Sequence, residues 1–388
     1  MLTREQNETL TQVGPRTPMG DLLRRYWFPL APKAEVDDVG MRPVRLLGED
    51  LVLFKDGEGR YGLLAEQCSH RLASLCFGLV EQDGIRCPYH GWKYDVEGNI
   101  LETPPERNEA IMHSVTHPAH PVQALGGLLF GYLGPAPAPL LPRYDILVRG
   151  DWVRRVEVHP VLDCNWLQPM ENSVDPAHAY WLHGYRGGAP LPEDDQEEFE
   201  TFEYGIYKYH YSADRIEVHP MVFPNILRGP GHVIHFRVPV DDTHTRILYV
   251  LAHPAPDGEP SGQVEVPFSY IGPIKELYDD QGTPRYRWHM ESFASQDGMA
   301  WETQGEIPDR TREHLGASDR GVVLLRRMLF DQLEAIQQGH DPIGVVRDPD
   351  QNRMIEFKVQ ETDKATGQVI PPRGAERRSF AARISQRI

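Results

Sequence analysis

The spacing of hydrophobic and polar positions divides the first third of the chain into two differently patterned segments. Residues 1–26 show the spacing of short helices, interrupted by Gly14-Pro15 and by Pro18, and end in an amphipathic turn. From residue 27 to about 135, short apolar runs alternate with turn residues, which predicts strands rather than helices. The clearest predicted strands cover residues 44–47, 51–54, 61–64 and 128–133. The pattern therefore predicts a helical lead-in followed by a small β-rich unit.

A larger unit is predicted beyond the proline-rich stretch 135–139, whose composition is typical of a stiff connector. Strand-like alternation at 151–160 gives way to a helical pattern over 163–183. Further strands are predicted at 206–211, 233–240 and 246–252. Residues 319–338 form the clearest amphipathic helix, and its apolar face carries Val322, Leu325, Leu329 and Leu333. A chain of 388 residues is long enough for these two domains.

Composition narrows the class of protein. The net charge of −17 disfavours a nucleic-acid partner, because phosphate binding needs clustered Lys and Arg. Only four cysteines occur, at 68, 76, 87 and 164, which suggests no disulfide framework and a reducing compartment. The N-terminus is too polar for a signal peptide, and no apolar run of about 18 residues would span a membrane. These observations predict a cytoplasmic protein.

Two short segments of the β-rich unit combine cysteine and histidine. Cys68 and His70 stand in one, Cys87 and His90 in the other, and 16 residues (71–86) separate them. Two thiolates and two imidazoles suit a two-iron, two-sulfur cluster with the cysteines on one iron and the histidines on the other. The same side chains could hold tetrahedral zinc. Zinc fingers usually group Cys with Cys and His with His, whereas here each segment carries one of each, which favours the cluster.

The second segment runs on as Gly-Trp-Lys-Tyr-Asp over residues 91–95, and the whole stretch closely resembles a Rieske domain. The resemblance implies that Cys68, His70, Cys87 and His90 bind the [2Fe-2S] cluster. Its one departure is Ser69, where many members of the family have proline, and this position is not a ligand.

A second cluster of potential metal ligands lies between Asn172 and His183. Asp175 followed by proline is a good helix start, with Asp at the N-cap. His178 and His183 are five residues apart, about 140° around a regular helix, so they could share a metal only if the helix distorts or ends between them. Taken alone, such a pair is more often structural. Two histidines and one carboxylate, however, make the facial triad of non-haem iron(II) oxygenases.

The pattern Asn172-x-x-Asp175-x-x-His178-x4-His183 resembles that of the Rieske non-haem iron oxygenases. The resemblance implies that His178 and His183 bind a mononuclear iron, and it favours Asp297 as the third ligand because relatives carry a similar Gln-Asp before an apolar helix. It also implies catalytic roles for Asp175 and Asn172. The competing carboxylates Asp309 and Asp319 are interpreted as capping or surface acids.

The resemblance has consequences for fold and assembly. It implies an α+β protein, with a small all-β Rieske domain and a larger catalytic domain built on an antiparallel sheet with helices (a helix-grip, START-like fold). The expected divisions are 1–26 (a helical lead-in packing on the catalytic domain), 27–135 (Rieske domain) and 136–388 (catalytic domain). A head-to-tail homotrimer, alone or paired into a hexamer, is implied, in which Asp175 bridges His178 and the partner subunit's His90. A buried carboxylate between two ligand imidazoles would orient both.

The resemblance spans residues from about 10 to 345 and is nearest to the branch that holds phthalate dioxygenase and aromatic O-demethylases. Residues 17–20, 238–245 and 304–319 carry this similarity. It implies a terminal oxygenase that uses dioxygen and electrons from a separate flavin- or ferredoxin-type reductase. Its reaction on an aromatic compound would be ring hydroxylation or oxidative O- or N-dealkylation. The alternative, a Rieske electron-transfer protein without oxygenase chemistry, leaves the larger domain unexplained.

The sequence leaves the substrate open between a dicarboxylate and a neutral methoxy- or N-alkyl-arene. Any one of the candidates for an aromatic slot is more often an ordinary core residue; they are Phe202, Tyr207, Phe223, Asn225, Leu227 and Trp288. Arg215, Arg228 and Arg237 could meet a substrate carboxylate or could serve as surface and salt-bridge groups.

Overall fold

The computed structural model describes residues 1–107, 110–183, 196–229, 232–255, 260–278, 281–282, 284–363, 366 and 368–370. The chain begins with two helices, α1 (Arg4–Thr11) and α2 (Pro18–Leu23). Each has a threonine N-cap, because Thr3 accepts from Gln6 N and Thr17 accepts from Gly20 N. The predicted helical lead-in is confirmed.

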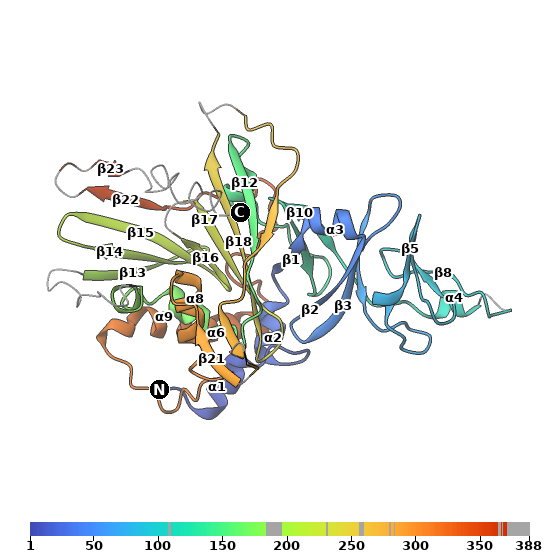
Figure 1. Ribbon diagram of the computed structural model, residues 1–388, viewed down its shortest axis with the longest axis horizontal. Coiled ribbons are helices and arrows are strands. Elements are labelled where there is room, and N and C mark those ends of the chain that lie inside the picture. The colour runs from blue at the N-terminus through green and yellow to red at the C-terminus, as the bar shows by residue number, and fades with distance from the viewer. Residues whose placement is uncertain are drawn as a thin grey trace.

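The β-rich unit (residues 27–132) contains three small antiparallel sheets and lies at one end of the long axis in Figure 1. The first sheet has the order β1 (Trp27–Pro32), β11 (Leu128–Tyr132), β10 (Val122–Leu125). The second has the order β2 (Met41–Leu46), β3 (Glu49–Lys55), β4 (Tyr61–Ala65), β9 (Ala119–His120). The third has the order β5 (Leu79–Glu81), β6 (Gly84–Arg86), β7 (Lys93–Tyr94), β8 (Ile100–Glu102). Short helices α3 (Lys33–Val39), η1 (Leu75–Phe77) and α4 (Ala110–Ser114) connect them.

The large unit (residues 152–370) is organised around one ten-stranded sheet. Its main path is β13 (Gln196–Phe202), β14 (Gly205–Tyr211), β15 (Arg215–Val222), β16 (Ile226–Gly229), β17 (Val233–Pro239), β18 (Thr245–Pro254), β12 (Trp152–Val158), β19 (Phe268–Tyr270). Strand β22 (Gln360–Asp363) pairs with β15 and with β23 (Val369–Ile370), while β20 (Lys275–Tyr278) and β21 (Pro284–Trp288) form a separate hairpin. All pairings of the large sheet are antiparallel except that of β12 with β19.

Helices of the large unit gather along one side of this sheet in Figure 1. They are α6 (Leu167–Ser173), α7 (His178–Trp181), α8 (Phe293–Glu302) and α9 (Arg320–Gln337), with α5 (Asp145–Val148) and η3 (Ala317–Asp319) as short additions. Helix α9 confirms the predicted amphipathic helix, since Val322, Leu325, Leu329 and Leu333 are all buried. The expected α+β class is therefore confirmed.

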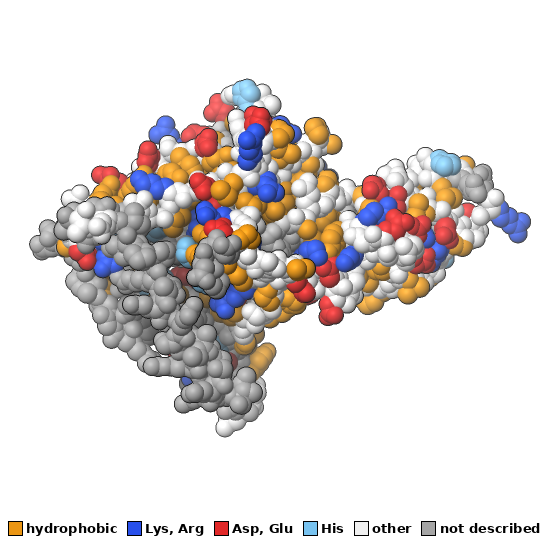
Figure 2. All heavy atoms as spheres, turned by 90° about the horizontal axis from the view of Figure 1, so that it is seen from above, with side chains coloured by type: hydrophobic (Ala, Val, Ile, Leu, Met, Phe, Trp, Pro, Cys, Tyr) orange, Lys and Arg blue, Asp and Glu red, His pale blue; other side chains and the backbone are white. Residues whose placement is uncertain are grey.

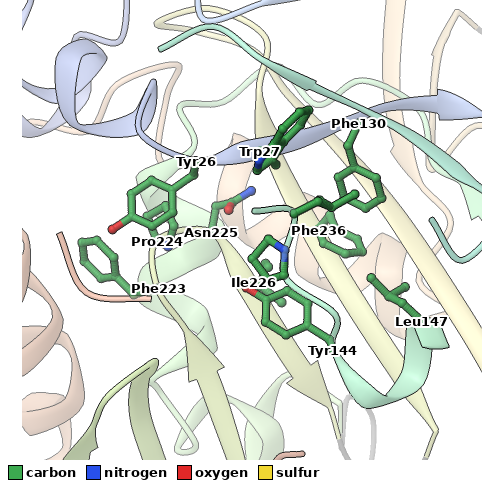
Figure 3. Close-up of a pocket in the computed structure, with 12 residues that line it drawn as sticks. Tyr26, Trp27, Phe130, Tyr144, Leu147, Phe223, Pro224, Asn225, Ile226 and Phe236 are labelled. Carbon is green, nitrogen blue, oxygen red and sulfur yellow. The ribbon is translucent and has the colours of Figure 1, made fainter. Parts of the chain in front are cut away.

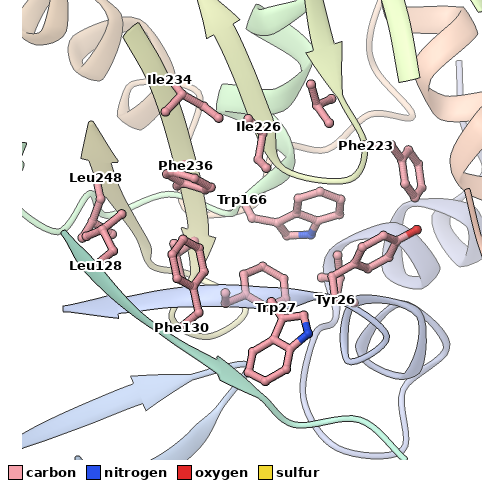
Figure 4. Packing of buried hydrophobic residues seen from close by; sticks show 14 of the residues in the cluster. Tyr26, Trp27, Leu128, Phe130, Trp166, Phe223, Ile226, Ile234, Phe236 and Leu248 are labelled. Carbon is pink, nitrogen blue, oxygen red and sulfur yellow. The ribbon is translucent and has the colours of Figure 1, made fainter. Parts of the chain in front are cut away.

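The two units share one hydrophobic core. Tyr26 contacts Phe223 edge-on at 5.9 Å between ring centroids, and Phe130 of β11 contacts Phe236 of β17 at 5.6 Å (Figure 4). Beside these rings lies a cavity of only about 20 Å³, lined mainly by aromatic and aliphatic side chains (Figure 3). That space suffices for about one water molecule and not for an aromatic substrate. Phe223 and Asn225, which line this cavity, are buried core residues at the contact between the units.

The structure resolves the helical pattern predicted over 163–183 into two helices. α6 ends at Ser173 and α7 begins at His178, on either side of the helix start predicted at Asp175. Several strands, β13, β15 and β16 among them, were missed.

Cys164 is a buried free thiol, whereas Cys76 is partly exposed. Across the described residues, no helix has both the length and the apolar character needed to cross a membrane.

Candidate metal centres

The two Cys/His segments form loops with the same backbone hydrogen bonds. In each loop the cysteine N–H donates to the carbonyl five residues on, and the cysteine carbonyl accepts from the N–H four residues on. The fourth residue after each cysteine has a left-handed backbone, with φ of 63° at Leu72 and 75° at Gly91. Glycine adopts this conformation freely, whereas leucine is strained there. The matched loops present Cys68 and Cys87, and with them His70 and His90, as two pairs.

The four side chains do not surround one point. The rings of His70 and His90 lie 4.5 Å apart between centroids. The two thiols are also neighbours, since burial and the adjacent Cys68 thiol both raise the pKa of Cys87. Among the described residues, no three of these four ligand atoms lie within 4.8 Å of one another, as a single tetrahedral ion would need. His70 Nδ1 is buried and has no hydrogen-bond partner in the described chain. A thiol pair and an imidazole pair fit a two-iron cluster better than zinc.

Neighbouring side chains hold the loops in place. The Tyr94 hydroxyl lies 3.0 Å from Cys68 Sγ, and the Trp92 ring stacks on His70 at 4.7 Å. Buried His117 donates from Nε2 to the Ala65 carbonyl (2.9 Å), which leaves Nδ1 to accept from the Ser69 hydroxyl at 2.8 Å. Ser69, the departure from the family pattern, therefore ties the first loop to the second sheet.

The second centre brings together residues that are far apart in sequence. Ligand atoms of His178, His183 and Asp297 all lie within 4.8 Å of one another, the only such group of three or more in the part of the chain that is described. His183 Nε2 lies 3.4 Å from Asp297 Oδ1, and His178 Nε2 lies 3.8 Å from it. Helix α7 ends at Trp181, between the histidines, and thereby allows the two rings to face one point.

Hydrogen bonds orient both imidazoles of this site. His183 Nδ1 donates to Gln296 Oε1 at 2.9 Å, and His178 Nδ1 donates to the Asp175 carbonyl. Each Nε2 is then left with a lone pair directed at Asp297, which is the arrangement that metal-bound histidines show. Gln296 is itself held by its Nε2, which donates to the Met290 carbonyl at 2.8 Å.

The Asp297 side chain is partly buried, and its Oδ1 is fully buried and has no hydrogen-bond partner among the described residues. Burial raises the pKa of Asp297, although the nearby His183, His178, Arg237 and Lys208 oppose that rise. Two imidazoles and a desolvated carboxylate oxygen on one side form a donor set suited to iron(II) with open positions. The residues present therefore fit a mononuclear iron.

Asp175 does not occupy the N-cap position expected for it. Helix α7 begins three residues later, and the Asp175 Oδ1 accepts from Ala177 N at 3.0 Å. Its Oδ2 lies 3.7 Å from His178 Nδ1. Burial alone would raise the pKa of Asp175, but the hydrogen bond and charge of His178 outweigh it, so that this pKa falls below its usual value. The Asn172 carbonyl accepts from Asp175 N at 3.1 Å and so fixes the turn.

The competing acids are occupied elsewhere. Asp309 accepts from Thr311 N and from the Thr311 hydroxyl, and Asp319 accepts from Gly316 N in the turn before α9. Neither belongs to the group of converging ligand atoms among the described residues.

Polar side chains on the helix-facing side of the sheet were missed by the sequence reasoning. Lys208 of β14 and His219 of β15 are direct partners, as are His235 of β17 and Tyr249 of β18, and β16 lies between the two pairs. A polar residue on one face of an otherwise apolar strand is the signal that could have found them. Of these four, Lys208 and Tyr249 lie near enough to interact electrostatically with Asp297.

The two centres lie far apart within one chain. Figure 1 shows β5 and β8 at one end of the long axis and α8, which carries Asp297, well toward the other. The end that carries the cluster loops shows basic and acidic side chains mixed together in Figure 2. In the third sheet of this unit, Arg86 and Lys93 pair with Glu81, and Lys93 also pairs with Asp83.

Comparison with known families shows two matches. Residues 26–121 match the family described as Rieske [2Fe-2S] domain. Residues 288–378 match the family described as LigXa C-terminal domain like.

Relatives match along almost the whole chain. The chain is 41% identical over 374 residues to the 5,5'-dehydrodivanillate O-demethylase oxygenase subunit of Sphingobium sp. (strain NBRC 103272 / SYK-6), which covers 92% of this chain and 86% of that protein. It is 36% identical to the phenoxybenzoate dioxygenase subunit alpha of Ectopseudomonas oleovorans, with 87% of each chain covered. It is 33% identical to the phthalate 4,5-dioxygenase oxygenase subunit of Pseudomonas putida, with 92% of each covered.

Solved structures share the fold at lower identity. The oxygenase in a complex with ferredoxin of carbazole 1,9a-dioxygenase superposes with a TM-score of 0.60 at 19% identity, over 88% of this chain and 98% of that one. Dicamba monooxygenase bound to 3,6-dichlorosalicylic acid gives a TM-score of 0.60 at 16% identity, over 82% and 99%. These structures support the architecture alone.

Proposed function

Because the chain belongs to the Rieske non-haem iron oxygenases, in the phthalate dioxygenase-like branch, we propose that its reaction is oxidative O-demethylation of a methoxylated aromatic compound. The chain is the terminal oxygenase component of a multicomponent system. It takes electrons from a separate redox partner and uses dioxygen to oxidise an aromatic compound. The choice of O-demethylation rests on the O-demethylase relative and on the LigXa-like C-terminal match.

The convergence of three ligand atoms at His178, His183 and Asp297 is the observation that supports an oxygenase rather than an electron carrier. We propose these three residues as ligands of the mononuclear iron. Cys68 and Cys87 are proposed to hold one iron of the cluster, with the other held by His70 and His90. When bound, the cluster relays single electrons and the mononuclear iron binds and activates dioxygen.

The protein's own part in this chemistry is to hold and orient. Gln296 and the Asp175 carbonyl fix both imidazoles with Nε2 toward the metal position. Burial of Asp297 lowers the local dielectric and so strengthens its hold on a cation. In the proposed reaction, a methyl ether, dioxygen, two electrons and two protons give a hemiacetal and water. The hemiacetal then breaks down to a phenol and formaldehyde.

We propose that the active assembly is a head-to-tail homotrimer, alone or doubled into a hexamer. The wide separation of the two centres within one chain supports this, because electrons would need a shorter route from a partner's cluster. Asp175 would bridge His178 and the partner subunit's His90, and Asn172 would position the turn that carries it. The redox partner is proposed to be a flavin- or ferredoxin-type reductase.

We propose that the chain divides into a helical lead-in (1–26), a Rieske domain (27–135) and a catalytic domain (136–388), and that the protein is cytoplasmic. The end of the connector 135–139 is held against β1, because Trp27 Nε1 donates to the Pro139 carbonyl at 2.9 Å.

The test supplies the purified protein, a reductase and NADH with a panel of methoxy-, N-alkyl- and carboxy-substituted arenes. Oxygen uptake and formaldehyde are measured together with iron content. We expect about three irons per chain and one formaldehyde for each oxygen consumed with methoxyarenes. Oxygen uptake with a hydroxylated ring product and no formaldehyde would replace O-demethylation by ring hydroxylation. About two irons per chain and no substrate-dependent uptake would favour the electron carrier.

A further inference from the structure

The two histidines of the proposed iron site are supported in different ways. His183 Nδ1 donates to Gln296 of α8, a ten-residue helix with several buried side chains. His178 Nδ1 donates to the Asp175 carbonyl, which belongs to the same turn of the chain. Such a bond orients the His178 ring on its own segment, but it cannot fix the direction of that segment in the molecule. The aim of the His178 ring therefore depends on what anchors α7.

Packing anchors α7 poorly. The helix has four residues, none of them buried, and Trp181 at its end has an exposed fraction of 60%. So short a helix is not stable alone, and most helices in proteins are stabilised by burial of an apolar face. The turn that leads into α7 is fixed at one point, because Pro176 is buried. A second point of contact is needed to set the direction of α7, and with it that of the His178 ring.

Tyr180 provides a contact of this kind. Its hydroxyl lies 2.6 Å from Nε2 of His210 on β14, and the two rings lie 5.7 Å apart between centroids. Tyr180 stands in the sequence between the two histidines of the iron site. The hydrogen bond therefore joins the segment that carries these histidines to the large sheet.

His210 is in turn oriented by a carboxylate. Glu197 of β13 is its direct partner across the two strands, and Glu197 Oε1 lies 3.9 Å from His210 Nδ1. The exposed fractions of these two side chains are only 11% and 12%. A carboxylate on this side of the ring favours a proton on Nδ1, which leaves Nε2 to accept from the phenol. The three groups thus form one directed chain from β13 through β14 to α7.

We propose that Tyr180 and His210 are positioning residues for the iron ligand His178, and that Glu197 keeps His210 in the tautomer that accepts from Tyr180. This inference rests on the proposed iron site and adds to it residues that touch neither the metal nor the substrate. Support of this kind holds a ligand ring toward the metal, and its loss weakens metal binding without removing any ligand.

A purely structural tether is the competing explanation, because the same bond also joins a helix to the edge of a sheet. The two explanations differ in what the metal site shows. If the bond only stabilises the fold, Tyr180→Phe lowers the melting temperature and leaves metal binding as in wild type. If the bond positions His178, Tyr180→Phe changes metal affinity and ligand geometry at temperatures where the protein is fully folded.

Metal binding to the oxygenase, with its cluster present and its mononuclear site emptied, tests the proposal. The probes are iron(II) and Co(II). Affinity is measured by chelator competition, and ligand geometry by the EPR spectrum of bound Co(II), because the oxidised [2Fe-2S] cluster gives no EPR signal. We expect Tyr180→Phe to weaken binding of both metals by about 10-fold and to alter the Co(II) spectrum, with the cluster intact.

Variants of the partner sharpen this test. His210→Leu should match Tyr180→Phe, and the double variant should be no worse than either single one, because both changes remove the same bond. His210→Gln should keep most of the affinity, since its amide oxygen can accept from the phenol. Additive losses in the double variant, or a loss in His210→Gln as large as in His210→Leu, would contradict the role of this bond.

Tyr209→Phe is the matched control, because Tyr209 precedes His210 on β14 and its hydroxyl donates to Glu200 at 2.7 Å. It should bind both metals as wild type does. Wild-type affinity and spectrum in Tyr180→Phe, or an equal loss in Tyr209→Phe, would overturn the positioning role. Failure of the iron site itself looks different, since His178→Ala would then bind both metals as tightly as wild type.

Discussion

The cluster loops and the iron site are built in opposite ways. The loops are held by backbone hydrogen bonds within a few residues of each cysteine, in two copies of one geometry. The iron site is assembled from two segments of sequence, and the bond that links them, from His183 to Gln296, spans 113 residues. The first centre is a local structure and the second a product of tertiary packing. The difference predicts that the loops tolerate changes around them, whereas the iron site depends on second-layer side chains.

The largest expected effect is loss of the cluster alone. Cys87→Ala removes one of two thiolates from an iron, so we expect the red-brown colour and all activity to disappear. The iron of the large unit should remain, with iron content falling from about three to about one per chain. Visible absorption and metal analysis provide the measurement. A variant that keeps a full Rieske-type spectrum would remove Cys87 from the ligand set.

The complementary change should empty the iron site alone. Asp297→Ala removes the carboxylate of the triad, so iron should fall to about two per chain while the cluster spectrum stays intact and activity is lost. Asp309→Ala is the control and should retain all iron, because Asp309 only closes a turn with Thr311. The opposite outcome, with iron lost from Asp309→Ala and kept in Asp297→Ala, would mean that Asp297 is the wrong ligand.

A weaker effect should follow from removing the support of a ligand. Gln296→Leu keeps the size of the side chain but takes away the acceptor for His183 Nδ1. Affinity for iron should fall by about 10- to 100-fold, measured by chelator competition, with an unchanged cluster. Gln304→Leu, which removes a side chain that bonds only its own helix turn, should behave as wild type. Equal iron affinity in both variants would show that His183 needs no such support.

The smallest expected effect concerns the corresponding support in the cluster loops. Tyr94→Phe keeps the ring packed beside His117 and removes only the hydroxyl next to Cys68 Sγ. Hydrogen bonds to the sulfurs raise the reduction potential, so redox titration should show a lower potential with full cluster content. Tyr89→Phe, which alters an exposed tyrosine beside His90, should leave the potential unchanged. A potential that moves equally in both variants would contradict this role for Tyr94.

The same contrast explains what the sequence could predict. The cluster ligands could be predicted because Cys68 with His70 and Cys87 with His90 are contiguous pairs. Helix α9 could be predicted because its apolar face, from Val322 to Leu333, repeats over about three turns. Asp297 needed a family resemblance, because no local spacing links it to His178. The sequence left the role of Arg237 open and did not single out Lys208, since only the sheet register and the packing of α6 bring both to Ser173. The break between α6 and α7 could be predicted because Asp175 followed by proline marks a helix start.

The central claim is that the two centres work as one through Asp175, across a subunit boundary. Asn in its place keeps the size of the side chain and the hydrogen bond from Ala177 N, but lacks the charge that would hold two imidazoles. Loss of this charge should therefore slow electron transfer between the two centres and leave both metal centres occupied. A role limited to capping the turn predicts a nearly silent change, since Asn caps as well as Asp.

Stopped-flow oxidation of the pre-reduced cluster by oxygen and substrate, in wild type and in Asp175→Asn, tests this claim most directly. Iron content, cluster spectrum and oligomer size are measured on the same samples and should match wild type. The bridge predicts that cluster oxidation in Asp175→Asn slows by orders of magnitude. An unchanged rate, with metals and assembly intact, would contradict it.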